Sequence, residues 1–262
     1  IIMEMASYFM KHTEVAHGTI KILFTPDEEV GMGTAHLDIK KLNADFGYTL
    51  DGGALGSFEM ETFSADGFTL FIEGVIAHPG YAKGIMQSAI KLAAAIVQAL
   101  PTDTWCPEST NEKQGFVHPV GIHGEAEKAK IDFIIRDFDS NQLAIYGQRI
   151  VDIANHVIAT NGQFNKCSVR YEQKEQYRNM KEVLDQYPEV VNRALDAYRA
   201  AGLEPKIEPI RGGTDGSRMS FMGLPCPNIF TGMQAIHSRH EWVGVTDMEK
   251  AVEVLINIVK TS

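Results

Sequence analysis

Residues 19–33 read TIKILFTPDEEVGMG, and this stretch decides how the rest of the chain is interpreted. Its first half, residues 19–25, is apolar and rich in β-branched side chains, which is typical of a buried strand. Its second half is an acidic loop that contains proline and glycine, so Glu28 and Glu29 lie where the predicted strand ends. Ligand sites in α/β sheets favour such strand ends.

A second carboxylate repeats this arrangement. Residues 46–50 predict another short strand, and Asp51 follows it directly. Carboxylates that are held close together repel one another unless a cation neutralises them, and oxygen ligands beside an imidazole suit zinc, manganese or cobalt. His237, in the segment HSRHEWV, is the candidate imidazole. A lone histidine is more often structural, and this segment lacks the paired histidines of the familiar zinc-binding helix.

The middle of the chain has a different texture. From about Gly67 it predicts, in order, a strand, a helix, two strands, a helix and a strand, which is the split βαβ arrangement. These elements are residues 68–74, 84–100, 117–123, 131–137, 140–159 and 166–173. We therefore expect residues 64–174 to form an inserted α+β, ferredoxin-like domain.

The flanking segments, residues 1–63 and 175–262, predict a single α/β domain with a mixed sheet and flanking helices. Its expected elements beyond the insertion are a helix at 188–201, a Gly-rich loop at 211–217, a strand at 227–231 and a helix at 247–260. Residues 1–10 predict an amphipathic helix without a cap residue, so we expect the chain to begin within this domain.

Composition excludes several classes of protein. The chain has 262 residues, of which 44% are hydrophobic and 22% charged, so it can form a packed core. Its net charge of −10 argues against nucleic-acid binding, which needs clustered Lys and Arg. The longest apolar stretch, residues 89–100, is too short to span a membrane. Three widely spaced cysteines predict no disulfide framework and fit a reducing cytoplasm.

Three further features have both an ordinary and a functional interpretation. His78 precedes Pro79 and Gly80, where a histidine commonly belongs to a turn. Arg136 could form an ion pair at a strand end. The Gly-rich loop could be a tight turn, or it could let backbone approach a ligand closely.

Six stretches together carry a family resemblance: FTPDEEVG, TLDGG, AHPGYAKG, RDFD, RGGTDGSRMSFMGLPCPNIFTG and HSRHEWV. In this order and separation they resemble the tripeptide aminopeptidases of the zinc-dependent M20 peptidase family, from the first residues to the last. The resemblance implies that the chain is part of a cytoplasmic enzyme that releases the N-terminal residue of short peptides. It also implies two zinc ions per complete site, for which cobalt or manganese can substitute.

The resemblance assigns roles to the acidic residues. Glu28 matches the general base of the family, and Glu29 matches the metal ligand beside it. Asp51 and His237 match further metal ligands, with His240 the less favoured of the two histidines. In such a site the metals activate a water molecule, Glu28 takes its proton, and the same carboxyl protonates the leaving amine.

The resemblance also implies partners for the site. His78 corresponds to a histidine that reaches across a homodimer and steadies the oxyanion, so the inserted domain is expected to be both lid and dimerisation surface. Arg136 is a candidate for binding the carboxylate of the substrate, and Asn179 is a weaker contact candidate. The remaining substrate-binding candidates are Arg211, Gly212, Gly213 and Thr214.

The sequence departs from the family in one respect. It contains neither a His-x-Asp-Thr segment nor the bridging aspartate, and His12 and His17 do not replace them. We therefore expect this chain alone to be inactive or very weak. The alternatives are a non-catalytic dimerisation or binding fragment, or another hydrolase of the family such as a dipeptidase or aminoacylase.

Overall fold

The computed structural model describes residues 1–260 and divides into two compact units. Unit 1 contains residues 1–62 together with the chain from residue 179 onward, and unit 2 contains residues 63–178. The expected insertion, 64–174, ends four residues earlier than unit 2. The mixed α/β class expected from the sequence is confirmed.

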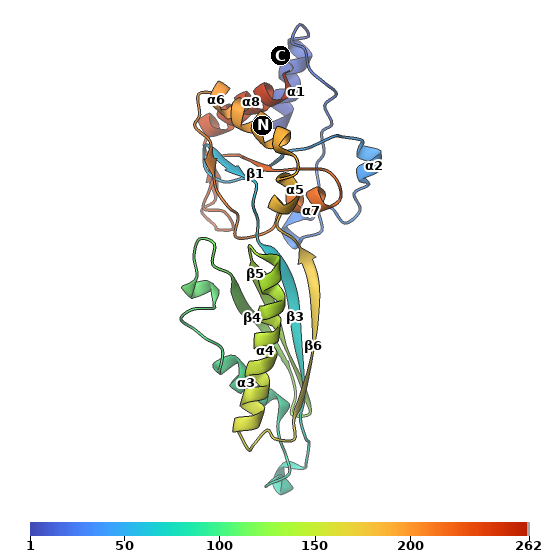
Figure 1. Cartoon of the computed structure of the whole chain (residues 1–262), viewed down its shortest axis with the longest axis vertical. Coiled ribbons are helices and arrows are strands. Elements are labelled where there is room, and N and C mark those ends of the chain that lie inside the picture. Colours follow the sequence, from blue (N-terminus) through green and yellow to red (C-terminus); the bar gives the residue numbers. More distant parts are fainter. Residues whose placement is uncertain (261–262) are drawn as a thin grey trace. The chain divides into compact units, whose positions relative to one another are not determined.

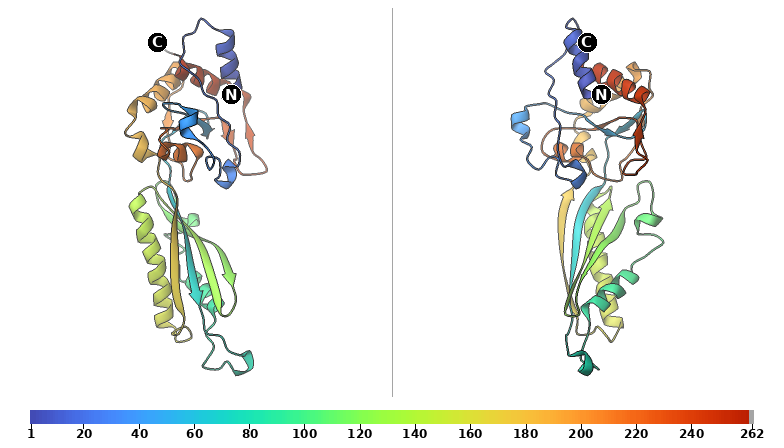
Figure 2. Two further views of the ribbon diagram at one scale, coloured as in Figure 1. Left: turned by 90° about the vertical axis from the view of Figure 1, so that its right-hand side faces the viewer. Right: turned by 180° about the vertical axis from the view of Figure 1, so that it is seen from behind.

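Unit 2 is a four-stranded antiparallel sheet with two helices on one face, as Figures 1 and 2 show. The strands lie in the order β4-β5-β3-β6, and along the chain the elements follow the expected order of strand, helix, two strands, helix and strand. Their bounds are β3 Ser64–Glu73, α3 Ala89–Gln98, β4 Phe116–Gly124, β5 Lys128–Asp137, α4 Ser140–Thr160 and β6 Ser168–Tyr177.

Alternation along the strands explains why one face of this sheet is covered. Phe68, Leu70 and Ile72 of β3 are buried in the same apolar cluster as side chains of α3 and α4, because successive strand residues point to opposite faces. The helix α4 begins where the Asp139 carboxylate accepts the N–H of Asn141. The resulting core needs no contribution from unit 1.

All six elements of unit 2 differ from their predicted bounds, β4 and α4 by no more than one residue at either end, and the differences at β6 and α3 have a visible cause. Strand β6 continues to Tyr177 because it stays paired with β3 as far as Ala65. Helix α3 begins at Ala89 rather than residue 84, because Gln87 is held outside it. The backbone of Gln87 forms an antiparallel bridge with Val75, and its side-chain oxygen accepts the N–H of Lys166.

Unit 1 contains a mixed sheet in the order β1-β8-β2-β7. Strand β1 is parallel to β8, β8 is antiparallel to β2, and β2 is parallel to β7. The bounds are β1 Thr49–Gly52, β2 Ser57–Glu59, β7 Lys206–Ile207 and β8 Asn228–Phe230. A separate hairpin is formed by β9 Met233–Gln234 and β10 Trp242–Val243.

Two sets of helices bury this sheet. Side chains of three longer helices pack with Phe58, Ile229 and Phe230 in one apolar cluster. These helices are α1 Ile2–Lys11, α6 Pro188–Ala200 and α8 Val245–Val259. A smaller cluster brings α2 and α7 together. The remaining helices are α2 Ile39–Leu42, α5 Lys181–Leu184, α7 Asp215–Phe221 and the 3-10 turns η1 Glu28–Val30, η2 Pro79–Tyr81 and η3 Pro107–Ser109.

Three predictions for unit 1 were wrong in detail. Residues 19–25 form no strand within the described chain, and Ile22 and Phe24 are exposed, because no described strand pairs with this segment. Strand β1 begins three residues later than expected, so Asp51 lies inside it, because the pairing with β8 continues to Gly52. The Gly-rich loop becomes helical at Asp215.

None of the helices that the structure describes is both long and apolar enough to span a bilayer.

Candidate active site

The acidic loop is shaped by a tight turn at its centre. Asp27 and Gly31 are both in the left-handed backbone region, with φ of 61° and 70°, and they flank the single turn η1. The N–H of Gly31 donates to the carbonyl of Glu28 over 2.7 Å, and the N–H of Met32 donates to that of Asp27 over 2.9 Å. Glu28 and Glu29 therefore lie on a closed loop that follows the extended segment.

Glu29 and His237, which the resemblance assigns as metal ligands, contact one another. The Nε2 atom of His237 lies 3.2 Å from Oε2 of Glu29, and both side chains are more than three quarters exposed, at 77% and 79%. His237 is held in the left-handed region with φ of 60°, and its N–H donates to the Glu241 carboxylate over 3.0 Å. The turn between β9 and β10 thus presents the imidazole to the acidic loop.

Glu28 and Asp51 share the electrostatic environment of this pair. Burial raises the pKa of Glu28, and the carboxylates of Asp51 and Asp215 raise it further. Burial raises the pKa of Asp51 to about 6, and Glu59 and Asp215 add to the effect. His237 lowers the pKa of both carboxyls. The site therefore holds more negative charge than its single imidazole can neutralise.

A complete metal site is not formed by these residues. Among residues 1–260, no group of three or more His, Cys, Asp or Glu side chains is placed to hold an ion. The structure brings together Glu29 and His237, while Asp51 lies near enough to both to be affected by their charges. His240 makes no described contact with Glu29.

Two important residues were missed by the sequence analysis. Asp215 begins α7, is 5% exposed, and its Oδ2 has no hydrogen-bond partner in the described part of the chain. Gly33 of the acidic loop packs against this carboxylate so closely that a Cβ at position 33 would lie 2.2 Å from Oδ2. Glu59, on β2, accepts the N–H of Gly53. The Gly-rich motif contains Asp215 and could have indicated it, but no local sequence signal indicates Glu59.

The Gly-rich loop at residues 211–217 has a structural role in the described chain. Thr214 is the N-cap of α7, and its hydroxyl accepts the N–H of Ser217 over 3.2 Å. Gly212 is uncrowded, since the nearest atom to a Cβ added there is 3.9 Å away. Arg211 is half-buried and Gly213 is exposed. Glycine at 212 is therefore not demanded by packing, which leaves room for a ligand contact.

Asn179 is buried, at 4% exposure, and supports the chain where unit 1 resumes. Its side-chain oxygen accepts the N–H groups of Thr62 and Lys181, at 3.1 and 3.0 Å. The hydroxyl of Thr62 in turn accepts the N–H of Met180. These bonds favour a structural role for Asn179.

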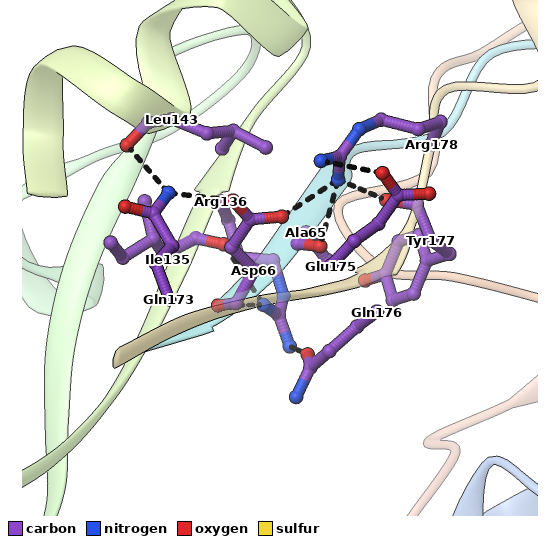
Figure 3. Close-up of polar contacts among 10 residues, drawn as sticks. All are labelled: Ala65, Asp66, Ile135, Arg136, Leu143, Gln173, Glu175, Gln176, Tyr177 and Arg178. Atoms are coloured by element: carbon purple, nitrogen blue, oxygen red, sulfur yellow. Dashed lines mark hydrogen bonds and ion pairs between the residues drawn. The ribbon is translucent and has the colours of Figure 1, made fainter. Parts of the chain in front are cut away.

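Arg136 belongs to a polar network at one end of the unit 2 sheet, shown in Figure 3. One terminal nitrogen donates to the carbonyls of Asp66 and Ile135, and the other donates to the side chain of Gln176 over 3.0 Å. Its guanidinium also lies over the ring of Tyr177. Burial lowers the pKa of Arg136. The ordinary interpretation of Arg136, a strand-end ion pair, would involve the neighbouring Asp137 or Asp139, and neither is among its described contacts.

His78 lies in unit 2, in the exposed loop between β3 and α3. Its Nδ1 accepts the N–H of Gly80 over 3.1 Å, so the neutral imidazole carries its hydrogen on Nε2. The ring packs beside Tyr81, which is 78% exposed. His78 therefore presents a hydrogen-bond donor to the surroundings of this loop.

Comparison with known proteins gives consistent matches. The family model described as Peptidase family M20/M25/M40 matches residues 1–261. The chain is 46% identical to Peptidase T of Clostridium perfringens strain SM101 over 259 residues, and 44% identical to Peptidase T of Clostridium botulinum strain Okra. These matches cover 99% of the chain but only 63% and 62% of the relatives, so the chain spans less than two thirds of their length.

Solved structures share the fold. A tripeptidase from Staphylococcus aureus superposes with a TM-score of 0.81 at 21% identity, covering 99% of this chain and 68% of that one. Aminopeptidase PepT from Bacillus cereus gives 0.76 at 23% identity, with 97% and 67% covered. A Bacillus subtilis protein described as a dinuclear metal-binding M20 peptidase gives 0.66 at 15% identity, with 97% and 68% covered.

The raised pKa of Asp51 predicts a pH-dependent effect on stability. Its carboxyl titrates near 3.8 when unperturbed and near 6 in the fold, so the folded state binds the extra proton between these values. The stability that the folded state gains from this extra proton is fully present below about pH 4 and is lost as the pH rises through 6. Asp51→Asn should therefore unfold at a higher temperature than the parent chain at pH 8, by about 2–4 °C per kcal/mol of relieved repulsion.

Circular dichroism melts at pH 4 and pH 8 test this expectation. The exposed Asp45→Asn is the matched control and should behave alike at both values. A stabilisation by Asp51→Asn that is equal at pH 4 and pH 8 would contradict it.

Proposed function

This chain belongs to peptidase family M20/M25/M40. We therefore propose that it is part of a metal-dependent aminopeptidase that releases the N-terminal residue of short peptides, tripeptides in particular. The observation that carries the proposal is the contact of Glu29 with His237, beside the half-buried Glu28. The relatives described as Peptidase T and the tripeptidase structure support the choice of substrate. Three free cysteines support a reducing, cytoplasmic location.

The side chains gathered here are of types that bind metal ions, but there are too few of them for a complete site. Glu29, His237 and Asp51 would hold the metal, and an excess of carboxylates with raised pKa values favours a cation there. We propose zinc, with cobalt or manganese able to replace it. When bound, such an ion polarises the scissile carbonyl and lowers the pKa of a bound water. We propose two zinc ions per complete site, and three side chains are too few ligands for both, so other polypeptide would complete the set.

Glu28 is proposed as the general base. It lies next to the ligand Glu29 on the same closed loop, yet its own carboxylate has no described contact with His237. Burial and neighbouring carboxylates raise its pKa, which makes it a better proton acceptor. The Glu28 carboxylate would take a proton from the attacking water and return it to the amine that leaves.

His78 is proposed to donate its Nε2–H to the oxygen of the reacting carbonyl, from the second copy of a homodimer. The hydrogen bond from Gly80 sets the donor tautomer in advance. Unit 2 would then be both the lid and the dimerisation surface, and the exposed Ile76, Tyr81 and Ile85 around His78 support a contact role for this loop.

The other end of the substrate would meet Arg136 and the loop that contains Arg211, Gly212, Gly213 and Thr214. Arg136 is a candidate for the substrate carboxylate, although its terminal nitrogens already have carbonyl and amide partners. Asn179 is retained only as a weak candidate, since it is buried and its oxygen has two donors.

The incomplete ligand set supports one alternative of another class. With too few ligands to hold an ion among the described residues, the chain alone could serve as a non-catalytic dimerisation or binding fragment. Within the family, a dipeptidase or aminoacylase is the other alternative. Hydrolysis of a free tripeptide, a free dipeptide and an N-acetylated amino acid, measured with Zn²⁺ or Co²⁺ and with chelator on a preparation with a complete ligand set, distinguishes these activities. No metal-dependent hydrolysis of any of the three would favour the fragment.

His237 and His240 form a matched pair for testing the metal site. His237→Ala should weaken Zn²⁺ binding by at least about tenfold, because it removes one of the two ligands in contact. His240→Ala should not, since its ring has no described contact with the acidic loop. Isothermal titration with Zn²⁺ measures both, and equal affinities for the two variants would exclude His237 as a ligand.

Glu28→Ala should lower tripeptide turnover by about a hundredfold or more, as expected for the loss of a general base. Bound metal, measured by mass spectrometry of the eluted ion, should stay nearly unchanged. The comparison needs a preparation with a complete ligand set, and turnover equal to that of the parent would remove Glu28 from the mechanism.

His78→Ala should reduce turnover without reducing bound metal. If the histidine acts across a dimer, mixing this variant with His237→Ala should restore part of the activity, because one mixed site would contain both intact residues. Failure of the mixture to recover activity would place His78 in the site of its own subunit.

A further inference from the structure

The backbone at Gly52 and Gly53, which directly follows Asp51 and is called here the Asp51 turn, is held by bonds to the segment after β8. The carbonyl of Gly52 accepts both the N–H and the hydroxyl of Thr231, at 3.1 and 3.0 Å. The carbonyl of Gly53 accepts the N–H of Gly232 over 3.0 Å. A Cβ at position 52 would lie 2.6 Å from the carbonyl oxygen of Ile229, so only glycine fits there.

The remaining backbone donor of this turn is held by a side chain. The N–H of Gly53 donates to Oε1 of Glu59 over 3.2 Å. The second oxygen of the same carboxylate accepts the side-chain N–H of Asn228 over 3.3 Å. Glu59 therefore bridges the turn after β1 and the central strand β8, with one carboxylate oxygen accepting from each.

Asn228 extends the bridge toward the Gly-rich loop. It is fully buried, and its side-chain oxygen accepts the hydroxyls of Thr49 and Thr214, the latter over 3.3 Å. Gly216 closes the space behind it, because a Cβ there would lie 2.8 Å from that oxygen. One buried amide thus joins the strand of Asp51 to the residue that caps α7.

We propose that Glu59 and Asn228 are positioning residues that hold the turn of Asp51 and the Thr214 cap in one fixed arrangement. The functional meaning of this junction rests on the proposed function, which makes Asp51 a metal ligand and Thr214 a substrate contact. The geometry of the junction does not depend on it. A movement of the Gly-rich loop would be transmitted to the end of β1 through three hydrogen bonds. They join Thr214 to Asn228, Asn228 to Glu59, and Glu59 to Gly53.

The chemistry of the junction supports a positioning role over a purely stabilising one. Glu59 is half-buried. A carboxylate that is partly removed from water is costly unless its oxygens are hydrogen-bonded, and well-packed apolar residues often stabilise a core as well or better. Burial raises the pKa of Glu59, in keeping with that cost. What the carboxylate adds is direction, since it orders one backbone N–H and one amide at the same time.

Amide exchange measured by NMR on the 262-residue chain tests the proposal without metal or substrate. Glu59→Ala should speed exchange at Gly53 by at least about tenfold, because a hydrogen bond to a charged acceptor is lost. It should also speed exchange at Ser217, whose N–H donates to Thr214. A residue that only filled space would leave the Ser217 signal unchanged.

Two further variants complete the design. Glu59→Gln has one acceptor oxygen in place of two, so it can keep only one of the two bonds. Exchange should therefore become faster at either the Gly53 or the Ser217 amide and stay unchanged at the other. It carries the test if Glu59→Ala does not fold. Glu208→Ala is the matched control, because this exposed glutamate is an electrostatic neighbour of Glu59 and has no described hydrogen bond to the turn.

Unchanged Ser217 exchange in both Glu59 variants would overturn the junction. This readout separates the two proposals, because it needs neither metal nor substrate. A preparation with a complete ligand set that hydrolyses no peptide, together with coupled exchange in the 262-residue chain, would count against the proposed function while supporting the junction.

Discussion

The parallel pairing of β1 with β8 is the constraint on which the candidate site depends. It aligns Thr49 with Asn228 and Gly52 with Phe230, and so joins segments from opposite ends of the chain. The pairing brings the Asp51 turn to the end of β8, from which the chain continues to the hairpin that carries His237. Without it, Asp51 and the imidazole would have no common support.

Crowding at glycines makes this pairing specific. Gly52 fits only because it has no Cβ against the backbone of β8, and Gly216 fits for the same reason against the carbonyl of Cys226. Gly33 lies against the Asp215 carboxylate in the same way. Three close approaches therefore bring β1, α7 and the acidic loop together, and each would be opened by any side chain at that position. The site is assembled from backbone as much as from functional groups.

Charge is concentrated where this backbone converges. Glu28, Asp51 and Glu59 all have raised pKa values, and burial is the largest cause for each. Asp215 adds a buried carboxylate with an oxygen that no described donor satisfies. Burying several carboxylates close to one another is unfavourable without a cation or further hydrogen-bond donors. The excess of carboxylates in unit 1 and the small number of its proposed metal ligands therefore both indicate that the site needs a cation and further ligands.

The sequence by itself determined what depends on neighbouring residues. Alternation and helical periodicity predicted β3 to β6, α4, α6 and α8, and the motifs picked out Glu28, Glu29, Asp51 and His237. Tertiary structure decided what depends on distant partners: residues 19–25 lack a paired strand, Glu29 meets His237, and Glu59 holds the Asp51 turn. The physical reason is that ladder pairing and buried hydrogen bonds join residues far apart in the chain, and no local pattern specifies which donor meets which acceptor.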